Sequence, residues 1–171
     1  MNNNLIRILL IEDNPGDVRL IREILAEVPD ASWELESASR LSTGLECVAK
    51  YKPDIILLDL GLPDSQGLET LGKIYSKTTT VPIVVLTGLD DEATANQAVN
   101  KGAQDYLIKG QIHGRALWRI VCYAIGRKRI EDELRESERR LKEAQALGRI
   151  GSWEFDLATQ KLEWSEEVYE L

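Results

Sequence analysis

Cysteine and histidine are scarce in this chain of 171 residues, which has two cysteines and one histidine. Cys47 and Cys122 show neither a C-x-x-C pair nor the spacing of zinc ligands, and two cysteines do not make a disulfide scaffold. We therefore expect both to be reduced, unreactive core residues of a cytoplasmic protein. His113 lies beside Gly114 at the start of a predicted helix, without a surrounding phosphotransfer sequence. A solvated side chain is the preferred interpretation of this histidine.

Long hydrophobic runs and clusters of positive charge are missing as well. No apolar run approaches the ~20 residues that span a membrane, and the N-terminus lacks the charged segment and cleavage site of a secretory signal. The 21 lysine and arginine residues are outnumbered by 29 aspartate and glutamate residues, which gives a formal net charge of −8. Proteins that bind phosphate backbones need clustered basic residues. We therefore expect no membrane segment and no direct contact with nucleic acid.

What the chain does have, up to about residue 126, is a regular alternation of apolar runs and amphipathic segments. The apolar runs predict strands at residues 5–12, 33–38, 54–59, 81–87 and 103–109. The segments between them predict helices that begin at Pro15, cover 41–50 and 66–77, begin at Asp90 and end near Gly102, and begin at Ile112. This alternation indicates an α/β fold with a doubly wound, five-stranded parallel sheet in the order 2-1-3-4-5. We interpret Trp118 and Tyr123, in the last helix, as packing residues.

Polar residues follow the apolar runs at one edge of this sheet. Glu12 and Asp13 close the first strand, Asp59 the third, Thr87 the fourth and Lys109 the fifth. The carboxyl ends of parallel strands open into the ligand crevice of such sheets, so these side chains are expected to converge. Each residue alone has an ordinary interpretation as a cap, a turn or a solvated side chain. Five of them at matching strand ends argue for a site.

Three carboxylates in one crevice repel each other unless a cation lies among them. Oxygen ligands with open positions suit Mg²⁺, which keeps several waters and often bridges to a phosphate. Lys109 is suited to hold a phosphoryl oxygen as a point charge, and Thr87 to donate a hydrogen bond to another. Asp59, in the centre, is then the candidate nucleophile, since a carboxylate can accept a phosphoryl group.

These residues and their neighbours resemble the receiver domain of two-component response regulators over residues 5–126. The motifs that carry the resemblance are Ile11-Glu12-Asp13, Leu57-Leu58-Asp59-Leu60, Leu86-Thr87-Gly88 and residues 62–68 and 102–109. The resemblance implies a flavodoxin-like fold. It also implies a histidine kinase or phosphotransfer protein that donates a phosphoryl group to Asp59.

The same resemblance assigns roles to individual residues. It implies Mg²⁺ bound by Asp13, Asp59 and the backbone carbonyl of Gly61, with Glu12 acting mostly through water. It implies phosphate contacts from Thr87, Gly88 and Lys109, and a switch in which Thr87 moves toward the phosphate while Tyr106 packs inward. Mg²⁺-dependent self-phosphorylation and autodephosphorylation would follow.

Two positions carry small residues that matter for these expectations. Receivers usually carry a proline after the lysine, in a cis peptide, whereas Gly110 follows Lys109 here. A cis bond is much costlier without proline, so we expect a trans bond or a more mobile loop here. The resemblance therefore does not carry the usual shape of the output face over to this chain. Gly61 has no side chain, so water that attacks the neighbouring Asp59 is not sterically screened from that position.

Residues 127–147 are densely charged and predict a helical linker. Apolar residues recur at three- and four-residue steps if Arg127 and Ser137 fill the gaps: Ile120, Tyr123, Ile130, Leu134, Leu141 and Ala144. This heptad pattern favours a coiled coil, with a homodimer through the helix at 112–147 as the preferred interpretation. A single solvated helix is the alternative.

The last segment, 148–171, resembles the opening of a PAS sensory domain, on the residues of 146–156 and 162–165. Two strands, at 153–156 and 161–164, would be followed by a helix capped by Ser165. About 20 residues cannot bury a core, so we expect the truncated first part of a larger domain. The expected organisation is a receiver at 1–126, a linker at 127–147 and a PAS-like start at 148–171.

Three functions compete on these residues. The first is a phosphorylation-gated signalling module whose output passes along the helix at 112–147. The second is a scaffold of the same fold that does not turn over phosphate, although the acidic and lysine positions are all present. The third is an Mg²⁺-dependent phosphatase, which commonly needs a second aspartate two residues after the nucleophile, where this chain has Gly61.

Overall fold

The computed structural model describes residues 5–88, 92–148, 153–156 and 161–164. The chain divides into two compact units, residues 1–129 and 130–171. The predicted cap at Asp90, the turn after residue 156 and the helix at Ser165 lie outside the described residues. No helix among the described residues has the length and apolar character to cross a membrane.

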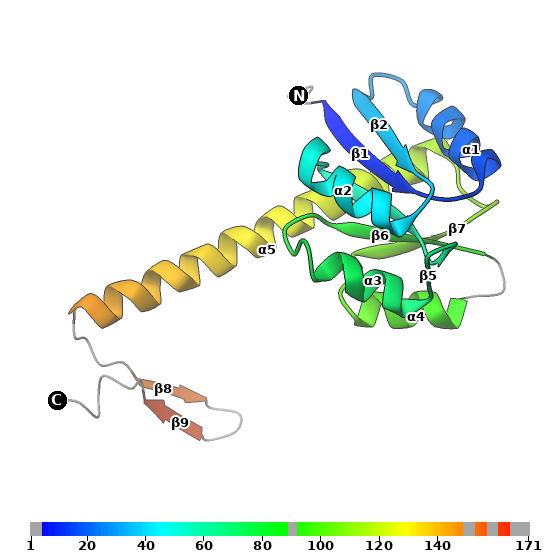
Figure 1. The fold of residues 1–171 in the computed structure, drawn as a ribbon. Helices are drawn as coiled ribbons and strands as arrows, with labels where there is room; N and C mark the ends of the chain where they lie inside the picture. Colours follow the sequence, from blue (N-terminus) through cyan, green and yellow to red (C-terminus); the bar gives the residue numbers. More distant parts are fainter. Residues whose placement is uncertain (1–4, 89–91, 149–152, 157–160, 165–171) are drawn as a thin grey trace. The chain divides into compact units, whose positions relative to one another are not determined.

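The first unit is built on a five-stranded parallel sheet with the order β2-β1-β3-β6-β7 (Figure 1). Its strands are β1 (Ile6–Ile11), β2 (Trp33–Ala38), β3 (Ile55–Asp59), β6 (Ile83–Thr87) and β7 (Asp105–Ile108). The order confirms the predicted 2-1-3-4-5, because β4 (Gly61–Leu62) and β5 (Ser65–Gln66) form a separate antiparallel hairpin.

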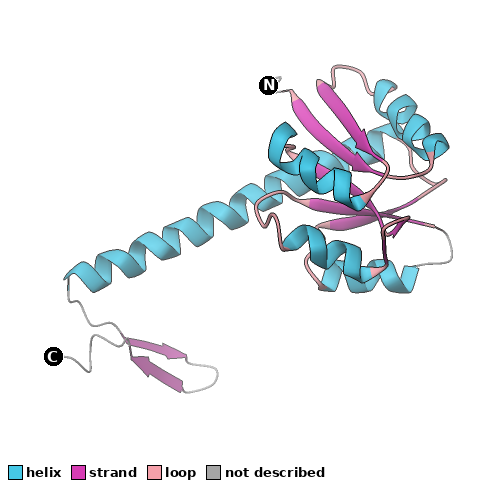
Figure 2. Cartoon of the chain, viewed as in Figure 1, coloured by secondary structure: helices cyan, strands magenta, loops and turns pink. Residues whose placement is uncertain are grey.

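Helices cover both faces of this sheet (Figure 2). They are α1 (Pro15–Ala26), α2 (Leu41–Tyr51), α3 (Leu68–Tyr75), α4 (Glu92–Asn100) and α5 (Gly114–Gly148). Residues of α1 and α5 pack with Ile8 and Leu10 on one face. Residues of α2, α3 and α4 pack with Leu9 and Ile11 on the other. Successive residues of β1 face opposite sides of the sheet, and helices pack on both sides. The apolar run of β1 is therefore continuous rather than alternating.

The element boundaries differ from the predicted ones where short structures intervene. The helix predicted at 66–77 begins at Leu68, because Ser65 and Gln66 pair with the preceding segment in the β4–β5 hairpin. The last helix begins at Gly114 rather than Ile112. Gly102 ends the turn after α4 with a φ of +112°, a left-handed conformation that glycine adopts without strain.

Two residues of α5 do not pack in the core of the first unit, and for Cys122 the predicted core position is wrong. Cys122 is exposed on α5 and is not a core residue, and Tyr123 on the same helix is 68% exposed. Trp118 packs against the core between α1, α5 and the sheet, as expected. Cys122 and Tyr123 lie one and two positions after the fully buried Val121, where a helix turns away from the face it buries.

The second unit contains the later part of α5 and an antiparallel hairpin. The hairpin strands are β8 (Trp153–Asp156) and β9 (Lys161–Trp164), which confirms the two strands predicted for this segment. Leu134 and Leu141 on the helix are each 59% exposed. This later part of the predicted heptad stripe is therefore on the surface of the described chain, whereas Ile120 packs partly against the core of the first unit.

Candidate functional site

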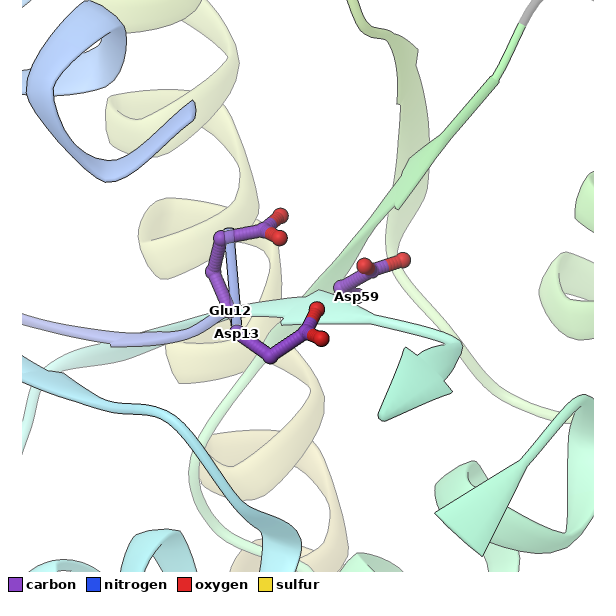
Figure 3. Close-up of side chains that lie close together, drawn as sticks. All are labelled: Glu12, Asp13 and Asp59. Carbon is purple, nitrogen blue, oxygen red and sulfur yellow. The ribbon is translucent and has the colours of Figure 1, made fainter. Parts of the chain in front are cut away.

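Three carboxylates meet at the carboxyl end of the sheet (Figure 3). Glu12 and Asp13 follow β1 and Asp59 ends β3, and these strands are paired with Ile11 opposite Leu58. One oxygen of each carboxylate lies within 4.8 Å of the other two. The sheet register thus brings together residues that are more than 40 positions apart in the chain, as predicted.

Glu12 is the most enclosed of the three, with 2% of its surface exposed. Its Oε1 accepts a hydrogen bond of 3.0 Å from the backbone N–H of Asn14. Its Oε2 lies 2.6 Å from the Lys109 ammonium as an ion pair, but without the angles of a hydrogen bond to any described residue. Burial raises the pKa of Glu12, and the nearby Lys109 opposes this rise.

Lys109 lies just after β7, where its backbone N–H donates to the Thr87 carbonyl at 2.7 Å. Its Nζ contacts three carboxylates, at 2.6 Å for Glu12, 3.1 Å for Asp17 and 3.0 Å for Asp59. Burial lowers the pKa of Lys109, but its close contacts with the Glu12 and Asp59 carboxylates outweigh this effect, and the pKa ends above its ordinary value. The lysine is therefore a fixed positive charge inside an acidic cluster.

A cavity of about 250 Å³ adjoins the Asp59 carboxylate. Its lining residues are Asp59, Leu60, Gly61, Gln66, Gly67, Leu86, Thr87 and Gly88. Thr87 is buried at the end of β6, and its hydroxyl donates to the Gly88 carbonyl at 3.3 Å, a long hydrogen bond. The predicted hydroxyl and the predicted nucleophile thus line one cavity.

Gly61 leaves the Asp59 carboxylate open on one side. The Gly61 backbone N–H donates to Asp59 Oδ1 at 3.2 Å. A Cβ at position 61 would lie 3.8 and 3.9 Å from the two carboxylate oxygens, at ordinary contact distance. A larger side chain would therefore stand beside the carboxylate. The role of the Gly61 carbonyl as a metal ligand stays a prediction.

Tyr106 and Gly110 lie on either side of Lys109 in the chain. Tyr106 is partly buried against the core on the α2, α3 and α4 face, and it lines a second cavity, of about 360 Å³, beside Gln111 and Ile120. The described residues contain no cis peptide bond, which confirms the trans bond expected before Gly110. Gly110 has a φ of +84°. Proline is fixed near −65° and cannot adopt this conformation.

Two contacts of this region were not predicted from the sequence. Asp17, in the first turn of α1, reaches Lys109, and the only local signal was an acidic residue one helical turn after Asp13. Asp64, between β4 and β5, caps α2 by accepting hydrogen bonds from the backbone N–H groups of Leu41 and Ser42. No local signal connects Asp64 with a helix that begins 23 residues earlier.

The donor set fits a hard divalent cation. The cluster offers three carboxylates at close range, and the buried Glu12 Oε2 forms an ion pair with Lys109. Mg²⁺ binds such oxygens and keeps waters in its remaining positions. It would also relieve the repulsion among these carboxylates, of which Glu12 and Asp59 form ion pairs with Lys109.

A comparison with protein families matches residues 8–119 to the response regulator receiver domain. The chain belongs to the response regulator receiver family. A receiver domain implies a histidine kinase or a phosphotransfer protein as partner, and receiver domains generally bind Mg²⁺ at an acidic pocket such as the cluster of Glu12, Asp13 and Asp59.

Individual relatives agree with this family. The transcriptional regulatory protein KdpE of Mycobacterium tuberculosis is 32% identical over 102 residues, 60% of this chain and 43% of KdpE. The chemotaxis protein CheY of Listeria monocytogenes is 30% identical over 108 residues, 61% of this chain and 87% of CheY. A crystal structure of a response regulator receiver domain protein from Clostridium thermocellum has a TM-score of 0.61 and 26% identity, over 73% of this chain and 98% of that one. The receiver chain spans less than half the length of KdpE.

Proposed function

We propose that this receiver accepts a phosphoryl group on Asp59 and changes conformation in response, as part of a two-component system or phosphorelay. The observation that carries the proposal is the contact of the Lys109 ammonium with Asp59 inside the three-carboxylate cluster. A structural ion pair would not need the additional carboxylates of Glu12 and Asp13, whose mutual repulsion destabilises the fold unless a cation binds. Glu12, Asp13, Asp59 and the Gly61 carbonyl are the proposed holders of Mg²⁺.

The proposed reaction is a displacement at phosphorus. A carboxylate oxygen of Asp59 forms a bond to the phosphorus of a phosphohistidine, and the phosphorus–nitrogen bond breaks with its electron pair left on the imidazole. Bound Mg²⁺ supplies charge neutralisation for the phosphoryl oxygens. Lys109 binds one phosphoryl oxygen, and the Thr87 hydroxyl turns from the Gly88 carbonyl to donate to another. Thr87 ends β6, which pairs with β3, and Lys109 follows β7, which pairs with β6.

Hydrolysis would remove the phosphoryl group from Asp59. A water molecule in the cavity beside Asp59 attacks the phosphorus, and the bond to the Asp59 oxygen breaks, which regenerates the carboxylate and releases phosphate. Gly61, Gly67 and Gly88 line this cavity without side chains. The open cavity supports autodephosphorylation by the receiver itself.

The proposed output is the long helix α5 and its exposed apolar stripe. Tyr123, Ile130, Leu134 and Leu141 are spaced by seven, four and seven residues, and each is more than half exposed. This spacing repeats at the heptad period, which suits a second copy of the same helix as the partner. Phosphorylation would change the packing of this dimer and pass the signal to a PAS-like region that begins with the β8–β9 hairpin.

Binding of beryllofluoride, a phosphoryl mimic, tests the function. Calorimetric titration in the presence of Mg²⁺ should show stoichiometric binding to the wild-type protein and none to Asp59→Asn. A thermal melt of both proteins checks that the substitution leaves the fold intact. Absence of binding to the folded wild-type protein would overturn the phosphoacceptor function and favour a scaffold with a receiver fold.

A further inference from the structure

Lys109 has as many carboxylate partners as it has N–H donors. An ammonium group carries three donors, and the three partners are Glu12, Asp17 and Asp59. Glu12 and Asp59 belong to the acidic cluster, whereas Asp17 comes from the first turn of α1 and lies outside it. The Asp17 contact therefore links α1 to the segment that follows β7.

We propose that Asp17 is a positioning residue that holds Lys109 in the unphosphorylated receiver and competes with the phosphoryl group for its ammonium. The proposal rests on the proposed function, because it assigns a second partner to the lysine of that same site. It adds a contact at α1 that phosphorylation breaks.

Competition follows from where the negative charge lies after phosphorylation. The Asp59 carboxylate becomes an acyl phosphate, so its ion pair with Lys109 is replaced by a contact to a phosphoryl oxygen, and the phosphoryl group carries about 1.5 to 2 negative charges. The phosphoryl oxygens lie farther from the Asp59 backbone than the carboxylate oxygens do, so an ammonium group drawn to them moves and gives up one of its other two ion pairs. The partner that leaves is the one whose carboxylate is most easily returned to water.

Asp17 is that partner. The side chain of Glu12 is fully enclosed, and leaving a buried carboxylate without its counter-ion is strongly unfavourable. The side chain of Asp17 is 27% exposed and can be hydrated where it stands. It also lies in the first turn of α1, where the helix dipole stabilises a negative charge without a lysine.

Release of Asp17 frees the chain segment around Lys109. That segment continues directly into Gly110, whose φ of +84° is a conformation open to glycine rather than to proline. A lysine detached from α1 and drawn to the phosphate therefore moves a backbone that proline does not restrain. Phosphorylation is thereby coupled to α1 as well as to β7.

The test measures the affinity of beryllofluoride with saturating Mg²⁺ by calorimetry. Asp17→Asn keeps the side-chain shape and removes the charge, so it removes the competitor. The expected result is binding about two- to fivefold tighter than wild type, in the range of a partly exposed ion pair. Glu23→Gln is the matched control, because it removes a charge from the same helix where the partner is Arg19 rather than Lys109. Its affinity should equal that of wild type.

A second comparison separates contact with Lys109 from a general effect of charge. In a Lys109→Met background, Asp17→Asn should give no further gain in affinity. Thermal melts without ligand identify any variant that fails to fold. If Lys109→Met fails to fold, the comparison of Asp17→Asn with Glu23→Gln tests the proposal by itself. Equal or weaker binding by Asp17→Asn overturns the proposal, as does a gain that persists without Lys109. Failure of the wild-type protein to bind would instead overturn the phosphoacceptor function.

Discussion

The Asp64 carboxylate accepts a hydrogen bond of 2.8 Å from the backbone N–H of Leu41, the first residue of α2. Its second oxygen accepts from Ser42 at 3.0 Å. Arg40, which precedes the helix, offers no side-chain cap of its own. A residue of the β4–β5 hairpin, next to the site, therefore supplies the cap that the helix lacks locally.

This cap makes stability depend on pH in a definite direction. The Ser42 hydrogen bond, and with it the one from Leu41, lowers the pKa of Asp64 to about 2, against about 3.9 in an unfolded chain. A pKa lowered by folding contributes stability that is complete above about pH 4 and is lost as the pH falls toward 2. Asp64→Asn should therefore lower the midpoint of urea unfolding at pH 7, and the difference from wild type should shrink at pH 3.

Glu46→Gln is the control for this comparison, because it removes a charge from α2 at a side chain 70% exposed and 3.9 Å from its partner Lys50. Its effect at pH 7 should be much smaller than that of Asp64→Asn. A difference between wild type and Asp64→Asn that is as large at pH 3 as at pH 7 would contradict the cap.

Gly114 fixes the approach of α5 to α1. A Cβ at this position would lie 2.6 Å from the backbone carbonyl oxygen of Ile24, which cannot turn aside as a side chain can. Gly114→Ala should lower the free energy of unfolding by about 1–3 kcal/mol, the usual cost of overpacking. Gly126→Ala, in the same helix with open space around its Cβ, should raise it by about 0.5–1 kcal/mol. Denaturant unfolding of the two variants measures both signs, and equal effects would refute the close approach.

Asp13 should strengthen Mg²⁺ binding and lower the stability of the metal-free protein. Asp13→Asn removes one of three converging carboxylates, so the metal-free protein should melt at a higher temperature than wild type. Its Mg²⁺ affinity should fall by at least about tenfold, and the rise of the melting temperature with Mg²⁺ should shrink accordingly. Melting curves with EDTA and with increasing Mg²⁺ test both statements. A variant that keeps the wild-type response to Mg²⁺ would exclude Asp13 as a ligand.

Gly61 should shorten the lifetime of the phosphorylated state. A Cβ there stands 3.8 Å from the nearer Asp59 oxygen, so Gly61→Met would place a side chain between the carboxylate and the water of the cavity. We expect the half-life of the phosphoryl group to lengthen several-fold. Gly72→Ala, in α3 with open space at its Cβ, serves as the control. An unchanged half-life in Gly61→Met would mean that water reaches the phosphorus from another side.

The stripe on α5 should hold the proposed dimer together. Leu134→Glu places a charge in the middle of the heptad pattern and should shift the protein from dimer to monomer in sedimentation equilibrium. Leu20→Glu alters another exposed leucine, on α1, and should leave the mass unchanged. A wild-type monomer at all concentrations, with and without beryllofluoride, would remove the dimer from the account.

The sheet and the polar residues at its edge could be predicted because their signals are local. A continuous run such as residues 55–58 is buried on both faces, and a run of this kind is typical of a central parallel strand. Asp59 then falls at the strand end whatever the exact boundaries. The predicted strand order also placed Glu12 beside it.

What was missed depends on tertiary contacts or on elements too short to show a period. The β4–β5 hairpin has two residues in each strand, which is too short to show an alternation of apolar and polar residues. The cap by Asp64 and the contact of Asp17 with Lys109 join segments far apart in the sequence. Cys122 was expected inside because cysteine is often buried, but its position after Val121 turns it outward.

The central claim is that Asp59 is the phosphoacceptor, and intact-mass spectrometry tests it most directly. The protein is incubated with Mg²⁺ and phosphoramidate, beside a sample with EDTA and beside Asp59→Asn. The account predicts that the wild-type protein with Mg²⁺ gains the mass of one phosphoryl group and that neither of the other samples does. An equal gain in Asp59→Asn would contradict it.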